Sequence, residues 1–149
     1  LVVNHTSEIN LSDILSQMEI TINDNDDLLL TTPILIGGPL QKERGFVLHR
    51  PYGKWSSSYG TSNDIVLTTS KDILHAIIKD KAPQKIMVIL GYAGWGRGQL
   101  EKEISDNVWL SCPADPEILF DTPIEQRWNK ALSLMGIRAQ NLVGYTGHA

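Results

Sequence analysis

The sequence contains a single cysteine, Cys112, among 149 residues, so no disulfide can form within the chain. Chains without such a cross-link are typical of reducing compartments, and we expect the protein to lie in the cytoplasm. No apolar run approaches the roughly 18 residues of a membrane span. The first residues also lack the charged and apolar regions of a secretory signal. The sequence therefore predicts a protein that neither spans a membrane nor is exported.

Basic residues are scarce as well. The chain carries 13 Lys and Arg against 17 Asp and Glu, which gives a net charge of -4. This balance disfavours the wide electropositive face that non-specific binding to phosphate backbones requires. No helix-turn-helix pattern with a basic recognition helix is recognisable. We therefore expect the partner to be a protein or a small anion, and not nucleic acid bound directly.

Motifs for metals and catalysis are missing too. The histidines lie far apart, and the chain has no H-x-x-x-H or C-x-x-C spacing. Neither Ser70 nor Cys112 falls in a nucleophile motif. The acidic stretch at residues 23–27 resembles the start of a calcium loop, but Leu29 occupies the position where that loop needs glycine, so we predict an exposed loop. We predict no metal, no cofactor and no catalytic residue, which favours a protein that is not an enzyme.

The composition is that of an ordinary globular domain, with 42% hydrophobic and 20% charged residues. Short connections between apolar runs indicate mostly antiparallel strands at residues 1–3, 34–36, 45–49, 65–68, 86–90 and 108–110. The run at 86–90 is continuously apolar, as in a central strand buried on both faces. We predict a single α+β domain over residues 1–137, followed by a loosely held tail at 138–149.

Helical spacing and capping residues predict the helices. Capping boxes are expected at Thr69 with Asp72 and at Thr122 with Glu125, and Asp115 should cap a helix that begins at Pro116. The apolar stripe of the last helix, which includes Trp128 and Leu132, is predicted to be core. The helices are expected to begin near residues 11, 69, 99, 116 and 123.

A glycine-rich loop from Gly91 to Gly98 follows the apolar run and opens a helix, which is where backbone N–H groups can hold an anion. Its glycines do not match the dinucleotide or P-loop fingerprints. We favour a structural role, in which the glycines allow positive φ angles and a close crossing of backbone. Anion binding beside Arg97 stays open. Arg44 enters a predicted strand, where a buried ion pair and a ligand contact are both plausible.

Several ordered segments resemble the AlgH/YqgE family, and together they cover most of the chain from Pro33 to Gly136. These segments are Gly37-Gly38-Pro39, Arg44-Gly45-Phe46-Val47-Leu48-His49, Thr68-Thr69-Ser70-Lys71-Asp72, Leu90-Gly91-Tyr92-Ala93-Gly94-Trp95, Gly98-Gln99-Leu100-Glu101, Asn107-Val108-Trp109-Leu110, Ala114-Asp115 and Leu119-Phe120.

The resemblance implies a bacterial cytoplasmic protein with an α+β fold built on a curled, mixed β-sheet. It implies no established activity and supplies no catalytic residues. Some members carry the label of transcriptional regulator, from an association with alginate production. Family members usually begin with a further segment that contains two strands, and we expect that part of the sheet to be missing from this chain.

Three hypotheses follow. The first is a non-enzymatic binding or regulatory protein that acts through a surface near Arg44 and the glycine-rich loop. The second is a small-ligand or anion-binding protein, or an unrecognised enzyme, that uses the same loop. The third is a transcriptional regulator that acts directly or through a partner protein. The residues predicted for the ligand or partner surface are Arg44, Tyr92, Trp95, Arg97 and Gln99.

Overall fold

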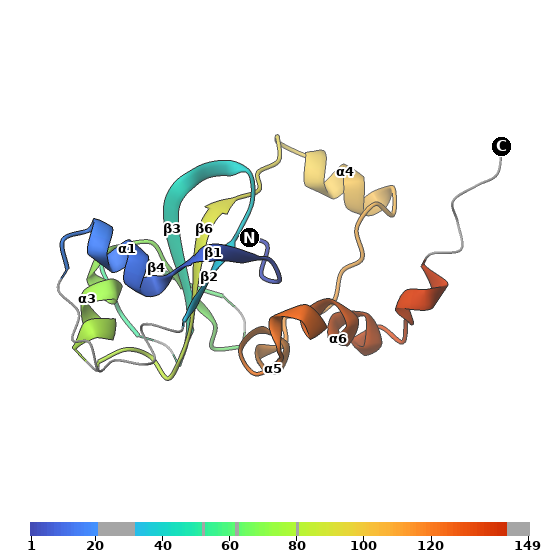
Figure 1. Ribbon diagram of the computed structural model, residues 1–149. Helices are drawn as coiled ribbons and strands as arrows, with labels where there is room; N and C mark the ends of the chain where they lie inside the picture. Colours follow the sequence, from blue (N-terminus) through green and yellow to red (C-terminus); the bar gives the residue numbers. More distant parts are fainter. Residues whose placement is uncertain (21–31, 52, 62, 80, 143–149) are drawn as a thin grey trace. The chain divides into compact units, whose positions relative to one another are not determined.

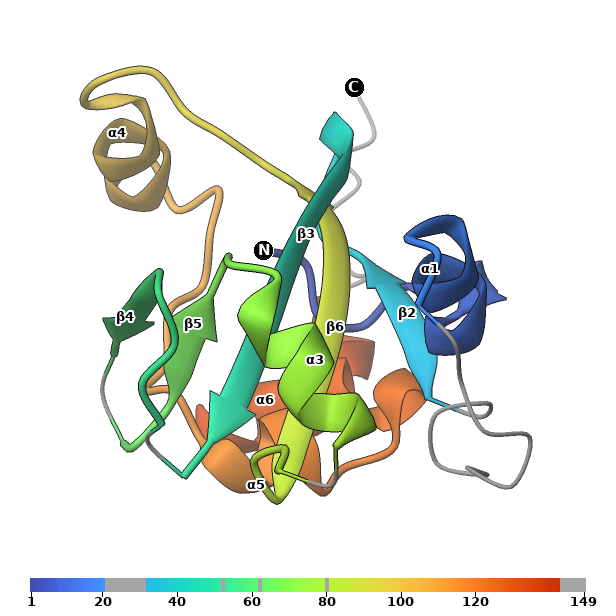
Figure 2. The ribbon, with the colours of Figure 1, turned by 90° about the vertical axis from the view of Figure 1, so that its left-hand side faces the viewer.

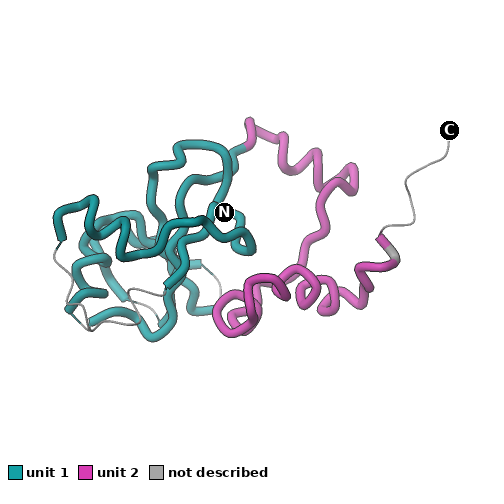
Figure 3. Tube along the Cα trace, viewed as in Figure 1, with its two compact units in different colours: residues 1–94 teal, residues 95–149 magenta. Residues whose placement is uncertain are grey.

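The computed structural model describes residues 1–20, 32–51, 53–61, 63–79 and 81–142. The chain forms two compact units, Leu1–Gly94 and Trp95–Ala149, which we refer to as unit 1 and unit 2 (Figure 3). The acidic stretch that we predicted to be an exposed loop lies outside the described residues, as do residues 143–149 of the predicted tail.

Unit 1 is built on a mixed six-stranded sheet with the order β1-β2-β6-β3-β5-β4 (Figure 1). Neighbouring strands are antiparallel except for β2 and β6, which pair in parallel. The apolar run expected to be a central strand is β6, which lies between β2 and β3. The α+β class with a mixed, largely antiparallel sheet is confirmed. The strands are β1 (Thr6–Asn10), β2 (Pro33–Ile36), β3 (Leu40–Arg50), β4 (Ser58–Gly60), β5 (Val66–Thr68) and β6 (Lys85–Tyr92).

Two short helices, α1 (Leu11–Gln17) and α3 (Asp72–Ile78), pack on one face of this sheet (Figure 2). Each helix places two apolar residues one turn apart, so that both side chains point toward the strands. Burying each of them contributes about 1.5–3 kcal/mol. The core of this face consists of Leu11, Leu15, Ile34, Val47, Ile73, Ile77 and Val88.

The starts of α1 and α3 show how local hydrogen bonds set the helix boundaries. The backbone N–H of Asn10 donates to Asp13 Oδ2 at 2.7 Å, and α1 begins at the next residue, as predicted. The capping box predicted at Thr69 is wrong, because α3 has Lys71 as its N-cap and Asp72 bonds outside the helix. The strand predicted at residues 1–3 is also wrong, since the first strand begins at Thr6.

Unit 2 contains helices joined by loops. They are α4 (Gln99–Ser105), α5 (Pro116–Phe120), the 3-10 turn η1 (Ile124–Gln126), α6 (Arg127–Leu134) and the 3-10 turn η2 (Ala139–Asn141). Asp115 caps α5 as predicted, because its Oδ1 accepts the backbone N–H of Glu117 at 2.8 Å. A salt bridge of 2.9 Å between Lys130 and Glu117 links α6 to α5.

The last helix differs from its prediction at its start and on its face. The Thr122 hydroxyl donates to the carbonyl of Glu117 at 3.0 Å, so it bonds to α5 and does not cap the helix that follows. The next segment begins as a 3-10 turn. Leu132 is buried as expected, but Trp128 is 50% exposed. The strand predicted at residues 108–110 is absent from the described structure, and these residues form an exposed loop.

Candidate functional site

The first predicted site residues lie on β3 and β6 of unit 1. The Arg44 guanidinium lies 5.5 Å from the centroid of the Phe46 ring, and Phe46 meets Tyr92 edge to face with ring centroids 5.9 Å apart. Arg44 Nη1 also donates to Gln41 Oε1 at 3.3 Å. Arg44 is exposed, so of the two interpretations left open by the sequence, the buried ion pair is excluded.

The other predicted residues lie in unit 2, where Glu103 of α4 brings two of them together. Trp95 Nε1 and Trp109 Nε1 both donate to Glu103 Oε2, at 3.0 and 2.7 Å. Gln99 Nε2 donates to Glu103 Oε1 at 2.9 Å. The two indole rings meet edge to face with centroids 5.8 Å apart. These hydrogen bonds lower the pKa of Glu103, and the bond from Trp109 contributes most. The carboxylate therefore stays ionised and holds both indole rings in place.

An exposed apolar segment continues from this cluster. Val108 is 65% exposed, Trp109 47% and Leu110 51%, in three consecutive residues. Apolar side chains gathered at the surface in this way mark interaction sites more often than isolated ones do. We call Trp95, Gln99, Glu103, Val108, Trp109 and Leu110 together the tryptophan surface.

The glycine-rich loop belongs partly to each unit. Gly91 has φ of 73°, and a Cβ at this position would lie 2.6 Å from the carbonyl oxygen of Gly38. Gly98 has φ of 75° and precedes α4. The Gly96 N–H donates to Gln99 Oε1 at 3.0 Å, so this amide is satisfied by a side chain. Positive φ and close backbone approach account for Gly91, as the structural interpretation predicted.

The predicted surface residues fall into two groups, one in each unit. Arg44 and Tyr92 lie in unit 1 and are linked through Phe46, whereas Trp95 and Gln99 lie in unit 2 and share Glu103. Arg97 is exposed in unit 2. The sequence indicated Trp95 and Gln99 but missed the role of Glu103. The one-turn spacing of Gln99 and Glu103 on α4 is the signal that could have found it.

Three polar side chains in the sheet of unit 1 are linked by hydrogen bonds. His49 Nε2 and the Thr68 hydroxyl are 2.9 Å apart, and the same hydroxyl is 2.8 Å from Ser58 Oγ. Burial lowers the pKa of His49, against an opposing contribution from the Pro51 backbone. Because His49 is fully buried and packs against the ring of Trp55, this hydrogen-bonded group is part of the core of unit 1.

Metal and membrane features are absent from the described part of the chain. Within it, no three His, Cys, Asp or Glu side chains come together in a way that could hold a metal ion. The helices there are all too short or too polar to cross a membrane. Cys112 is a free, exposed thiol.

Fold and sequence together define the class of this protein as α+β with a mixed, largely antiparallel sheet. The sequence profile described as AlgH-like matches residues 1–140, and the chain belongs to that family. This confirms the resemblance found in the sequence.

Curated bacterial relatives support the assignment over the full chain. A "UPF0301 protein" from Hahella chejuensis is 48% identical over 149 residues, which are 100% of this chain and 78% of that protein. Another from Chromobacterium violaceum is 46% identical over 149 residues, which are 100% of this chain and 79% of that protein. These names state no activity.

Two solved structures share the fold. The solution structure of the AlgH protein from Pseudomonas aeruginosa is 42% identical with a TM-score of 0.77, over 100% of this chain and 78% of that one. A crystal structure from Corynebacterium diphtheriae has a TM-score of 0.55 at 18% identity, over 77% of this chain and 59% of that one. At that identity the second likeness concerns the fold alone.

Proposed function

We propose that this chain is a non-enzymatic binding or regulatory protein of the bacterial cytoplasm, and that the tryptophan surface of unit 2 binds its protein partner. One observation carries the proposal: Glu103 holds both Trp95 and Trp109 by hydrogen bonds beside consecutive exposed apolar side chains. Tryptophan is enriched among the residues that contribute most to protein interfaces.

The arrangement favours binding because its side chains are already positioned. Holding an exposed indole in one orientation lowers the conformational entropy that association must overcome. Leu110 and Val108 add apolar area beside the rings. The partner expected here is a protein that presents apolar side chains. A free exposed thiol at Cys112 and the bacterial origin of the relatives support the cytoplasmic location.

Site-specific photocrosslinking in bacterial cells tests this proposal. A photoreactive amino acid replaces Val108, which is 65% exposed, and in a matched control it replaces Tyr59 of β4, which is 61% exposed. We expect position 108 to cross-link reproducibly to one protein that position 59 does not reach. With that protein purified, Trp109→Ala should weaken binding by about 2 kcal/mol or more.

Two further variants separate binding from folding. Arg97→Ala and Trp95→Ala should leave the circular dichroism spectrum and unfolding midpoint intact while weakening capture at position 108. Unfolding of these variants would indicate a structural role instead. Cross-links from position 108 that stay within the same chain, or that match those from position 59, contradict the proposal.

A further inference from the structure

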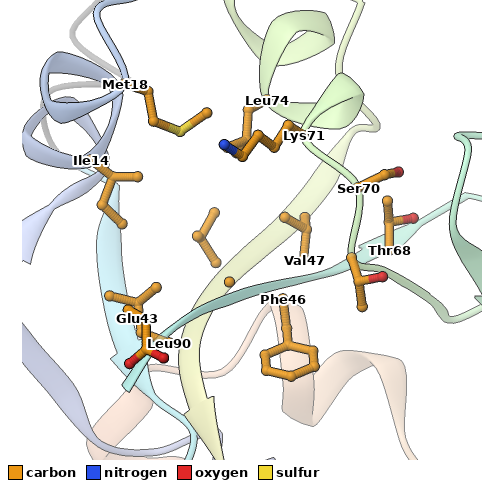
Figure 4. A pocket seen from close by; sticks show the side chains of 13 residues that line it. Ile14, Met18, Glu43, Phe46, Val47, Thr68, Ser70, Lys71, Leu74 and Leu90 are labelled. Atoms are coloured by element: carbon orange, nitrogen blue, oxygen red, sulfur yellow. The ribbon is translucent and has the colours of Figure 1, made fainter. Parts of the chain in front are cut away.

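Unit 1 contains a pocket that has no part in the function proposed above. It opens on the sheet face that carries α1 and α3, and its volume is about 160 Å³ (Figure 4). It is lined by Ile14, Met18, Glu43, Gly45, Phe46, Val47, Thr68, Thr69, Ser70, Lys71, Leu74, Val88 and Leu90. Five elements therefore contribute to it, namely α1, β3, β5, α3 and β6.

The inside of this pocket is apolar. Val47 and Val88, both almost fully buried, lie on the sheet, and Ile14 and Leu74 on the two helices are half-buried around the opening. Water in such a space makes few hydrogen bonds, so an apolar group gains free energy by replacing it. The interior therefore selects an apolar ligand.

The volume limits what this ligand can be. A cavity of roughly 150 Å³ lined by aliphatic side chains is large enough for one benzene molecule. Pockets for drug-sized molecules span about 300–1,000 Å³. A pocket of about 160 Å³ therefore accepts a short acyl chain or a single ring, and is too small for a nucleotide.

The rim determines the charge of the ligand. Figure 4 shows the Lys71 ammonium extended over the pocket toward Met18, while the Glu43 carboxylate points away from it. Both side chains are exposed. A ligand with its apolar end in the pocket thus brings its outer end to a positive charge, which favours a carboxylate.

Two of the hydroxyl groups that line the pocket, those of Ser70 and Thr68, are already engaged in hydrogen bonds. Ser70 donates to Asp72 Oδ1 at 2.5 Å and accepts the Ser57 N–H at 3.1 Å. Thr68 is bonded to His49 and Ser58. Their hydrogen bonds hold the pocket wall, and Lys71 is the cationic residue of the pocket lining that a ligand carboxylate can pair with.

We propose that this pocket binds a small amphipathic anion, a short acyl chain or single aromatic ring that carries one carboxylate. The apolar part lies between α1 and α3 against β3 and β6, and the carboxylate pairs with Lys71. This site is independent of the tryptophan surface, because all of its residues belong to unit 1.

Titrating the full chain with three ligands of the same length tests the proposal. Hexanoate, hexan-1-ol and hexylammonium are followed through the NMR signals of the Ile14, Met18 and Leu74 methyl groups. We expect saturable shifts with hexanoate, which should bind about tenfold more tightly than hexanol because of its charged contact. Lys71→Met should remove that tenfold difference and leave the affinity for hexanol unchanged.

Two variants serve as controls. Lys79→Met removes an exposed lysine at the other end of α3 and should leave hexanoate binding unchanged. Leu74→Phe partly fills the pocket and should weaken both hexanoate and hexanol. Equal affinity for hexanoate and hexanol, tighter binding of hexylammonium, or shifts that stay linear in ligand concentration and spread over the surface would each overturn the proposal.

Discussion

Asp72 is a residue whose ionisation contributes to local structure. Its Oδ2 accepts hydrogen bonds from the N–H and the hydroxyl of Ser56 at 2.8 and 2.7 Å, and its Oδ1 accepts the Ser70 hydroxyl at 2.5 Å. The bond from Ser70 is the largest cause that lowers the pKa of Asp72 from 3.8 to about 2. The ionised carboxylate therefore ties the loop before β4 to the start of α3.

This arrangement predicts a specific acid sensitivity. A carboxyl group whose folded pKa is depressed stabilises the fold above its unfolded pKa, and that contribution disappears as the pH falls through the folded pKa. Wild-type protein should thus lose the contribution of Asp72 between pH values near 4 and near 2. Asp72→Asn should be less stable at neutral pH by about 1 kcal/mol, since solvent screens this partly exposed group.

Urea unfolding between pH 2 and pH 7 measures the effect. The stability difference between wild type and Asp72→Asn should shrink as the solution becomes acidic. Glu8→Gln removes an exposed carboxylate on β1 and should follow the wild-type curve closely. If the unfolding free energies of Asp72→Asn and wild type differ by the same amount at every pH down to 2, the ionisation of Asp72 adds nothing to stability.

At the scale of the elements, Gly91 near the end of β6 and Gly98 just before α4 differ in a way that can be measured. Both have φ in the left-handed region, where an L-residue costs roughly 1–2 kcal/mol. A Cβ at Gly98 would meet nothing within 4 Å, whereas one at Gly91 would lie 2.6 Å from a backbone oxygen. Gly98→Ala should therefore cost about 1–2 kcal/mol, and Gly91→Ala clearly more.

Chemical denaturation of the two variants checks this comparison. NMR spectra should locate the changes in Gly91→Ala around Gly38 and Leu40, whose carbonyl oxygens lie next to the added methyl group. Equal destabilisation by the two substitutions would mean that the backbone crossing at Gly91 relaxes freely.

Sequence patterns predicted elements wherever local signals and burial agree. β6 was recognisable because its residues are continuously apolar, and α5 because Asp115 precedes Pro116. β4 was missed because Ser58-Tyr59-Gly60 has little strand propensity, and its pairing with β5 supplies the stability. The capping boxes at Thr69 and Thr122 failed because Asp72 and Thr122 bond to groups outside the expected helix.

The candidate sites were less predictable than the elements. Trp95 and Gln99 were found because they lie in a distinctive loop, but their common partner Glu103 depends on how α4 turns. The pocket of unit 1 left no signal in the sequence. Its lining comes from five separate elements, and only the fold brings Met18 and Lys71 to the same opening.

At the scale of the whole molecule, the prediction of one domain over residues 1–137 is open to direct measurement. Denaturant unfolding can be followed by the methyl signals of Ile34 in unit 1 and Leu132 in unit 2, both buried. If residues 1–137 form a single domain, the unfolding curves from the two methyl signals should have the same midpoint and slope, because small domains unfold cooperatively. Two separate transitions would show that the units fold independently and would contradict the prediction.

The position of β6 in the sheet limits when the complete sheet can form during synthesis. β6 lies between β2 and β3, although it follows both of them in the chain. While the ribosome still holds residues 85–92, β2 can pair with β1, and β3 with β5 and β4, but these two groups of strands lack the strand that joins them. The facing edges of β2 and β3 therefore stay unpaired until β6 emerges, and an unpaired strand edge of this kind makes a folding intermediate prone to aggregation.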